Sequence, residues 1–266
     1  MEQTDVLVKR TLSSGIRPVE WYARPMYATS DGRAVGGVVS VSVNSILYGV
    51  LSEDRFSDAL DMNETGVSLF LRTLLKLRAF LSEHPDFVHE KCRLFLPAPS
   101  ALLFADDPYR VLTDACGTPE RGRRYAVVPV FREEVMEEDP AYLAERFSAL
   151  RAAGFSVGLR GYGSADFPTA KLMTVTPDVL FLHKDMTAHL ADTFRADAVT
   201  AALRFAEALH AGVVAEGVRS DSDIRALYAA DVTAFLPSGD YRGHLRLTNE
   251  RLAPDRLVSL TKEDNA

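Results

Sequence analysis

The feature of this sequence that most limits its fold is the alternation, from Lys91 onward, of short apolar runs with segments of helical periodicity. Such alternation is how a parallel sheet with crossover helices appears in a sequence. Most of the runs are rich in Val, Leu and Phe at successive positions, which is typical of strands covered on both faces. The runs that we expect to be strands are Arg93–Leu96, Tyr125–Phe131, Ser156–Leu159, Asp178–Leu182, Gly212–Ala215 and Val232–Leu236.

The segments between these runs have helical start and stop signals. Asp139 and Pro140 supply an N-cap and a first-turn proline, and Gly154 ends the apolar stripe that follows them. Similar stripes occupy Phe70–Leu81 and Val199–Leu209. We expect these amphipathic segments to be helices that cover the outside of the sheet.

The first sixty residues follow a different pattern. Val19–Tyr27 and Val35–Val43 have the composition of strands, and a Ser-Asp-Gly turn at 30–32 separates them. The sheet is therefore expected to begin with an antiparallel hairpin.

Length and composition favour one domain. The 266 residues are 47% hydrophobic and 25% charged, which is ordinary for a globular protein. An α/β barrel of about 250 residues is a single domain, and the sequence contains no internal repeat, low-complexity block or linker-like stretch. We predict an α/β fold, a single TIM-like (β/α) barrel over residues 19–245, with an N-terminal extension at 1–18 and a polar C-terminal tail at 246–266.

Charge and hydropathy exclude several partners. The formal net charge is -7 and the Lys and Arg residues are scattered, which argues against a nucleic-acid polymer as partner. No segment reaches the roughly 20 apolar residues that span a bilayer, and the amino terminus has no signal-peptide core. We expect a cytoplasmic protein without a membrane partner.

Two motifs in the second half of the chain carry a family resemblance. Leu150–Met186 resembles the stretch of EAL domains, the bacterial cyclic di-GMP phosphodiesterases, that holds a DDFG loop and a KxD strand. At the spacing usual for the family, VVAEGV at Val213–Val218 matches the AEGVE motif. Upstream, WYARPMY, LFLPAPSAL and AVVPVFREE take the places of the EALLR, NxS and ExTE segments. The resemblance covers Val19 to Tyr241 and implies an EAL-type barrel.

The resemblance also implies where a catalytic site would lie. Active EAL domains hold two divalent cations between acidic and amide oxygens at the carboxyl ends of the strands, and hard cations require such ligands. Only Glu216 of the AEGV motif keeps the family residue. The replaced positions are Ala23 in EALLR, Leu96 in NxS, Pro129 in ExTE, Arg160 and Gly161 in DDFG, Phe181 and His183 in KxD, and Ala234 at a late glutamine.

These replacements imply that hydrolysis is lost. One carboxylate cannot hold a two-metal cluster, and Arg160 places a fixed positive charge where a cation would lie. We therefore expect no metal and no cofactor. The resulting hypothesis is a catalytically inactive bacterial signalling or regulatory protein that acts through an unknown protein partner, with a homodimer as one possibility.

Two alternatives stay open. The chain could be a non-hydrolysing receptor for cyclic di-GMP or another anion, because guanidinium groups pair bidentately with phosphate. The candidate anion-binding residues are Arg24, Arg132 and Arg160, which would otherwise pair with Glu216, Glu133 or Asp166 or face solvent.

Nucleotide binding is weakened by Tyr27, which takes the place of the phosphate-contacting arginine of EALLR. The other alternative is an enzyme of different chemistry in which Glu216 and His183 act as acid and base, which requires the two side chains to lie within hydrogen-bond reach.

Overall fold

Ten strands form one continuous hydrogen-bonded sheet in the computed structural model, which describes residues 2–13, 19–45, 49–85, 92–116, 125–188, 190, 193–238 and 245–246. The strands are β1 (Val19–Ala28), β2 (Ala34–Ser45), β3 (Gly49–Ser52), β4 (Cys92–Pro97), β5 (Tyr125–Phe131), β6 (Gly158–Tyr162), β7 (Val179–Leu182), β8 (Gly212–Val218), β9 (Ala234–Pro237) and β10 (Leu245–Arg246).

The first helix precedes β1, and the other helices lie between strands along the chain. The α-helices are α1 (Glu2–Ser13), α2 (Ser57–Leu60), α3 (Glu64–Glu83), α4 (Ser100–Phe104), α5 (Pro108–Cys116), α6 (Pro140–Ala152), α7 (Lys184–Thr187), α8 (Thr193–Ala208) and α9 (Asp221–Ala229). The 3-10 helices among the described residues include η1 (Glu53–Arg55), η3 (Glu133–Glu137) and η4 (Thr169–Met173).

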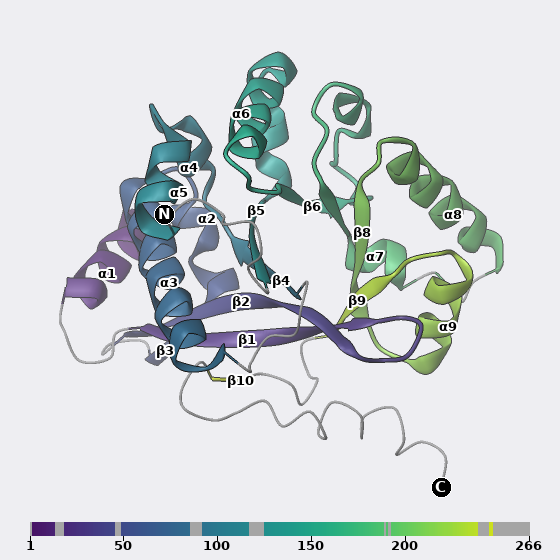
Figure 1. Ribbon diagram of the computed structural model, residues 1–266, viewed down its shortest axis with the longest axis horizontal. Coiled ribbons are helices and arrows are strands. Elements are labelled where there is room, and N and C mark those ends of the chain that lie inside the picture. The colour runs from purple at the N-terminus through teal and green to yellow at the C-terminus, as the bar shows by residue number, and fades with distance from the viewer. Residues whose placement is uncertain are drawn as a thin grey trace, which may run out of the picture.

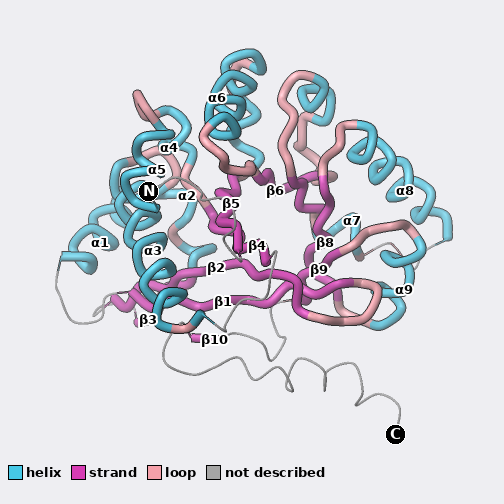
Figure 2. The backbone as a smooth tube through the Cα atoms, viewed as in Figure 1, coloured by secondary structure: helices cyan, strands magenta, loops and turns pink. Residues whose placement is uncertain are grey.

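Eight of the strands close into a barrel. Hydrogen-bonded neighbours run in the order β1, β9, β8, β7, β6, β5, β4 and β2, and the pairing of β1 with β2 completes the ring. β1 is antiparallel to both β2 and β9, whereas the other barrel neighbours are parallel. Strands surround the centre and helices lie outside them (Figures 1 and 2). The prediction of an α/β barrel with an antiparallel first strand is confirmed.

The barrel interior is packed with apolar side chains contributed by nearly every strand. Side chains alternate between the two faces of a strand, so one set points inward and the other packs under the helices. The inward set is a separate core cluster, formed by Met26, Val38, Phe95, Val128, Val130, Val179, Phe181, Val214, Ala234 and Leu236. This core supports the residues at the open end of the barrel.

The covering helices bury the stripes expected from the sequence. Asp139 caps α6 by accepting hydrogen bonds from the backbone N–H groups of Ala141 and Tyr142, each at 3.0 Å. The buried face of α6 contributes Phe147, whose ring stacks 6.1 Å from that of Phe131 on β5. The predicted cap and covering face are both confirmed for this helix.

Two strands begin later than the sequence predicts, because side chains form hydrogen bonds with the backbone groups that precede them. β6 begins at Gly158 rather than Ser156, because the Asp178 carboxylate accepts the Val157 N–H at 2.7 Å. β9 begins at Ala234 rather than Val232, because the Thr29 hydroxyl donates to the Val232 carbonyl at 2.5 Å.

The predicted terminal segments are described only in part. Within the N-terminal extension, α1 buries Val8 and Leu12 in a core cluster shared with β2, α2 and α3. Of the predicted C-terminal tail, only Arg246 is described, within β10, and residues 247–266 lie outside the described residues. Among the described helices, none has the length and apolar character needed to cross a membrane.

Candidate functional site

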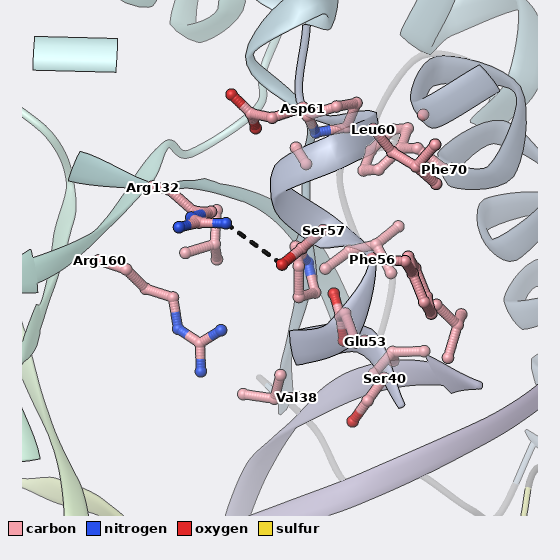
Figure 3. Close-up of a pocket in the computed structure, with 18 of the residues that line it drawn as sticks. Val38, Ser40, Glu53, Phe56, Ser57, Leu60, Asp61, Phe70, Arg132 and Arg160 are labelled. Carbon is pink, nitrogen blue, oxygen red and sulfur yellow. Dashed lines mark hydrogen bonds between the residues drawn. The ribbon is translucent and has the colours of Figure 1, made fainter. Parts of the chain in front are cut away.

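A cavity of about 1030 Å³ opens at the carboxyl ends of the parallel strands. Residues from the ends of β4 to β8 line it, together with Val38–Ser42 in the middle of β2. β1 contributes residues from its first half because it runs in the opposite direction. η1 and α2 border the cavity on one side, as Figure 3 shows for Glu53, Ser57 and Leu60.

An ion pair occupies the centre of this open end. Arg160 on β6 donates to the Glu216 carboxylate on β8, with Nη2 2.5 Å and Nε 3.2 Å from Oε1. The Arg160 guanidinium also lies 5.8 Å from the ring of Phe181 on the intervening strand β7. Burial lowers the pKa of Arg160, but the charge and hydrogen bonds of Glu216 outweigh it and raise the pKa overall. Arg160 is therefore a permanent cation fixed to Glu216.

Arg24 brings a second guanidinium to the same carboxylate. Its Nη2 atom lies 3.9 Å from Glu216 Oε1, and its Nε atom is buried without a hydrogen-bond partner among the described residues. Burial lowers the pKa of Arg24, and the charge of Arg160 lowers it further. The two arginines thus share a single close carboxylate.

Arg132 is neutralised at the edge of the cavity. Its guanidinium donates to Asp58 on α2 and to Glu134, with Nη2 2.5 Å from Glu134 Oε1. It also donates to the Ser57 hydroxyl at 3.2 Å (Figure 3). The expectation that the arginines pair with nearby carboxylates is confirmed for Arg160 and Arg24, but the partners of Arg132 are not the ones anticipated.

Glu133 is a cavity residue that the sequence reasoning did not assign to the site. Its carboxylate accepts a hydrogen bond from the Ser164 hydroxyl at 3.2 Å. Burial raises the pKa of Glu133, and the Ser164 bond only partly offsets this effect. Gly161 approaches so closely that a Cβ there would lie 1.2 Å from Glu133 Oε2, and its φ is +86°. Only glycine fits this backbone position without rearrangement.

The structure brings together most of the replaced positions in the second half of the chain. Arg160, Gly161 and His183 line the cavity, together with Glu216, which keeps the family residue. His183 also caps α7, since its Nδ1 accepts the Asp185 N–H at 3.4 Å. Phe181 and Ala234 point inward from their strands one layer below, in the barrel core.

Three replaced positions are not where the resemblance placed them. Ala23 and Leu96 belong to the outer core beneath the helices, although Leu96 also borders the cavity. Pro129 alternates with the inward-facing Val128 and Val130 and therefore points outward. The expectation that Ala23 and Pro129 face the open end is wrong, whereas Leu96 borders the cavity from the outer core.

Other apolar residues of the strands line the cavity. Val38, Pro97 and Val130 line the cavity on β2, β4 and β5. Val38 lies on β2, whereas we expected the corresponding residue to be Ala23 on β1. The reason is that β2, not β1, runs parallel to the remaining strands. Tyr27 also points outward, with its ring 5.8 Å from that of Phe235, so it does not occupy a phosphate-contacting position.

The cavity does not fit the pair of divalent cations expected of an active EAL domain. The described residues contain no group of three or more His, Cys, Asp or Glu that could hold a metal ion. Glu216 already binds Arg160, and the inward positions Val38, Pro97 and Val130 supply no side-chain oxygen. Hard cations require several oxygen ligands, which this arrangement lacks.

A closed α/β barrel with its cavity at the carboxyl ends of the strands, and with an antiparallel first strand, defines a class of proteins that includes EAL domains. The sequence model of the EAL domain matches residues 11–239. The chain therefore belongs to the EAL domain family.

Solved structures of EAL domains have the same fold. The PaMucR phosphodiesterase in complex with c-di-GMP has a TM-score of 0.72 at 16% identity, covering 88% of this chain and 94% of its own. The FimX EAL domain from Pseudomonas aeruginosa bound to c-di-GMP has a TM-score of 0.74 at 13% identity, covering 93% and 98%. An EAL domain protein from Listeria monocytogenes EGD-e has a TM-score of 0.69 at 15% identity, covering 100% and 98%. No curated protein matches the sequence.

Proposed function

We propose that this chain is a catalytically inactive EAL domain that acts as a regulatory protein in the bacterial cytoplasm through a protein partner. Its family includes proteins that bind or hydrolyse cyclic di-GMP. The observation that supports loss of hydrolysis is the ion pair between Arg160 and Glu216, with Nη2 2.5 Å from Oε1.

The chemistry of this ion pair argues against the family reaction. Metal-assisted hydrolysis requires a cation to polarise the phosphodiester and to activate water. Arg160 presents a fixed positive charge to Glu216, which keeps the family carboxylate of the AEGV motif. A metal would have to displace the guanidinium and would then find apolar inward neighbours at Val38 and Val130. The arrangement therefore favours an intact ion pair over a metal cluster.

The test is overnight incubation of the purified protein with cyclic di-GMP and millimolar Mn²⁺, followed by chromatography. We expect the cyclic dinucleotide to remain intact. Linear product that increases in proportion to the protein, and that disappears in Glu216→Gln, would overturn the proposal. The loss in Glu216→Gln separates hydrolysis by this site from a contaminating phosphodiesterase.

The alternative is a non-hydrolysing receptor for cyclic di-GMP, a ligand that is bound in the solved structure of the FimX EAL domain. The buried Nε atom of Arg24, which has no partner among the described residues, favours this alternative. The ion pairs of Arg132 and Arg160 weigh against it, because each would have to be broken to bind phosphate. Calorimetry with cyclic di-GMP, with and without Mg²⁺, distinguishes the two, since micromolar or tighter binding supports a receptor.

The partner itself requires a separate experiment. Affinity purification of the tagged protein from its source organism, under conditions that preserve the fold, should recover a specific protein. Reconstitution of that complex from purified components, with a defined stoichiometry, would support the proposal. Sedimentation of the purified chain alone tests whether it forms a homodimer.

A further inference from the structure

The cavity has a second arm that the EAL motifs do not explain. β2 pairs with β4 only from Gly36 to Val38, so the remainder of β2 separates from β4. Through this opening the cavity reaches α3, where Leu69, Phe70 and Thr73 line it. The arm therefore extends from the centre of the barrel to the helix layer.

The walls of this arm suit an alkyl or aryl group. Val39, Leu96 and Ala98 line it opposite α3. Thr73 is the one hydroxyl residue that α3 contributes, and it donates to the Leu69 carbonyl at 2.8 Å while accepting from Trp21 Nε1 at 3.1 Å. A polar ligand group placed here would lose its bonds to water without gaining replacements, which is unfavourable. An apolar group has no such cost.

The charges around the cavity favour a cation. Its lining includes six carboxylates and three guanidinium groups, a formal excess of three negative charges with His183 neutral. Each guanidinium lies within 4 Å of a carboxylate. Asp61, by contrast, accepts the Ser100 N–H at 3.1 Å but has no ion-pair partner among the described residues. It is an uncompensated negative charge at the cavity.

Asp61 also lies beside the apolar arm. It follows Leu60, and Figure 3 places it near Leu60 and Phe70, on the side of the cavity away from Arg160. On β2, Ser42 lines the same cavity, is only 5% exposed, and has a hydroxyl without a hydrogen-bond partner among the described residues. An uncompensated carboxylate is the feature expected of a part of the cavity that receives a cationic ligand group.

We propose that this cavity binds a small organic cation, in which an ammonium group is attached to an alkyl or aryl group. The apolar part lies between β2 and α3, and the ammonium group lies at Asp61. This inference goes beyond the proposed regulatory role, because it assigns the chemical class of a ligand and predicts discrimination against anions.

The first test compares probes that differ only in head-group charge. Hexylamine, hexanol and hexanoate are titrated into the unmodified protein by calorimetry, with methylamine as the head group alone. We expect hexylamine to bind most tightly and hexanoate to bind least. Among butylamine, hexylamine and octylamine, affinity should rise up to about fourfold per added CH₂ until the arm is filled. Hexanoate binding as tightly as hexylamine, or affinity independent of chain length, would overturn the proposal.

Matched variants then locate the site. Asp61→Asn keeps an oxygen that can accept the Ser100 N–H but removes the charge, and we expect about tenfold weaker hexylamine binding. Asp197→Asn makes the same change of net charge at an exposed site on α8 outside the cavity, and should bind as the unmodified protein does. If both variants weaken hexylamine binding equally, the binding reflects nonspecific attraction to the net charge of the protein, and the proposed site at Asp61 is wrong.

A third variant tests the arm. Ala98→Leu places a larger side chain in it and should weaken hexylamine binding at least tenfold without affecting Asp61, whereas Ala98→Ser keeps the arm open and should bind normally. Thermal melting establishes that both variants fold. If Ala98→Leu does not fold, the chain-length series in the unmodified protein decides the question. Hydrolysis is assayed on the same samples, so that failure of the proposed function is distinguishable from failure of this inference.

Discussion

Arg160 and Glu216 are joined across an intervening strand, with the guanidinium of β6 2.5 Å from the carboxylate of β8 and β7 between them. Both side chains are largely buried, at 30% and 17% exposure. Removing one partner from such a pair leaves the other charge poorly compensated. The stability of the open end of the barrel should therefore depend on this contact.

Glu216→Gln is expected to lower the free energy of unfolding by about 1–3 kcal/mol, because it leaves two guanidinium groups without their shared carboxylate. The matched control is Glu134→Gln, since Glu134 pairs with Arg132 but is exposed, and such pairs contribute about 1 kcal/mol or less. Urea unfolding followed by circular dichroism measures both. Equal losses in the two variants would contradict a special role for the central pair.

Glu133→Gln should increase stability at neutral and alkaline pH. Burial raises the pKa of Glu133 in the folded state, so its ionisation costs stability as the pH rises through that pKa. The cost is absent below the unfolded value of about 4.3. The variant should therefore gain over the unmodified protein near pH 8 and gain little near pH 4. Urea unfolding at both pH values tests the sign, and a gain confined to low pH would show it to be reversed.

Gly161→Ala should destabilise the protein by about 2–4 kcal/mol, because the new Cβ combines a left-handed backbone with overlap against Glu133. Gly49→Ala is the control, since Gly49 also has a positive φ but faces open space. It should cost about 1 kcal/mol. In a Glu133→Ala background, the cost of Gly161→Ala should fall toward that of the control, and an unchanged cost would exclude the carboxylate as its cause.

Millimolar Mn²⁺ should leave the melting temperature unchanged to within about 1 °C, because a ligand gives negligible stabilisation when its concentration lies well below its dissociation constant for the folded state. The described cavity lacks a cluster of metal ligands. Calorimetric thermal unfolding with Mn²⁺, and with a chelator, measures the difference. A rise in melting temperature that disappears in Glu216→Gln would reveal a metal site at the barrel centre.

The barrel could be predicted because its strands appear as short continuous apolar runs, whereas its helices show apolar residues at helical spacing. Whether a strand side chain points into the barrel or toward the helices was harder to predict, since strands such as β5 are apolar on both faces. Without alternation there is no signal to distinguish Pro129 from Val130, and a shift of one residue exchanges the two faces. The assignment of Ala23 failed for a different reason, because either strand of the hairpin has a suitable composition and only the pairing shows which one is parallel to β4.

The predictable part of the site lies on regular strands. Arg160 and Glu216 are each bordered by recognisable motifs, and parallel strands bring their carboxyl ends together. Glu53 and Asp61 belong instead to the short segment that joins β3 to α3, where no periodicity indicates which side chains turn toward the cavity. Their contribution depends on tertiary packing and could not be inferred from local sequence.

The close contact between Gly161 and Glu133 limits the order in which these two positions can be substituted. A single substitution that placed an acidic side chain at this position would create the overlap with Glu133 and would meet a backbone angle that disfavours side chains. Relocating Glu133 first would avoid the overlap, but that step removes a carboxylate already at the barrel opening. The order of the two changes therefore matters, and the direct mutational path passes through a less stable protein. The present geometry therefore opposes the introduction of an acidic side chain at position 161 while Glu133 keeps its place.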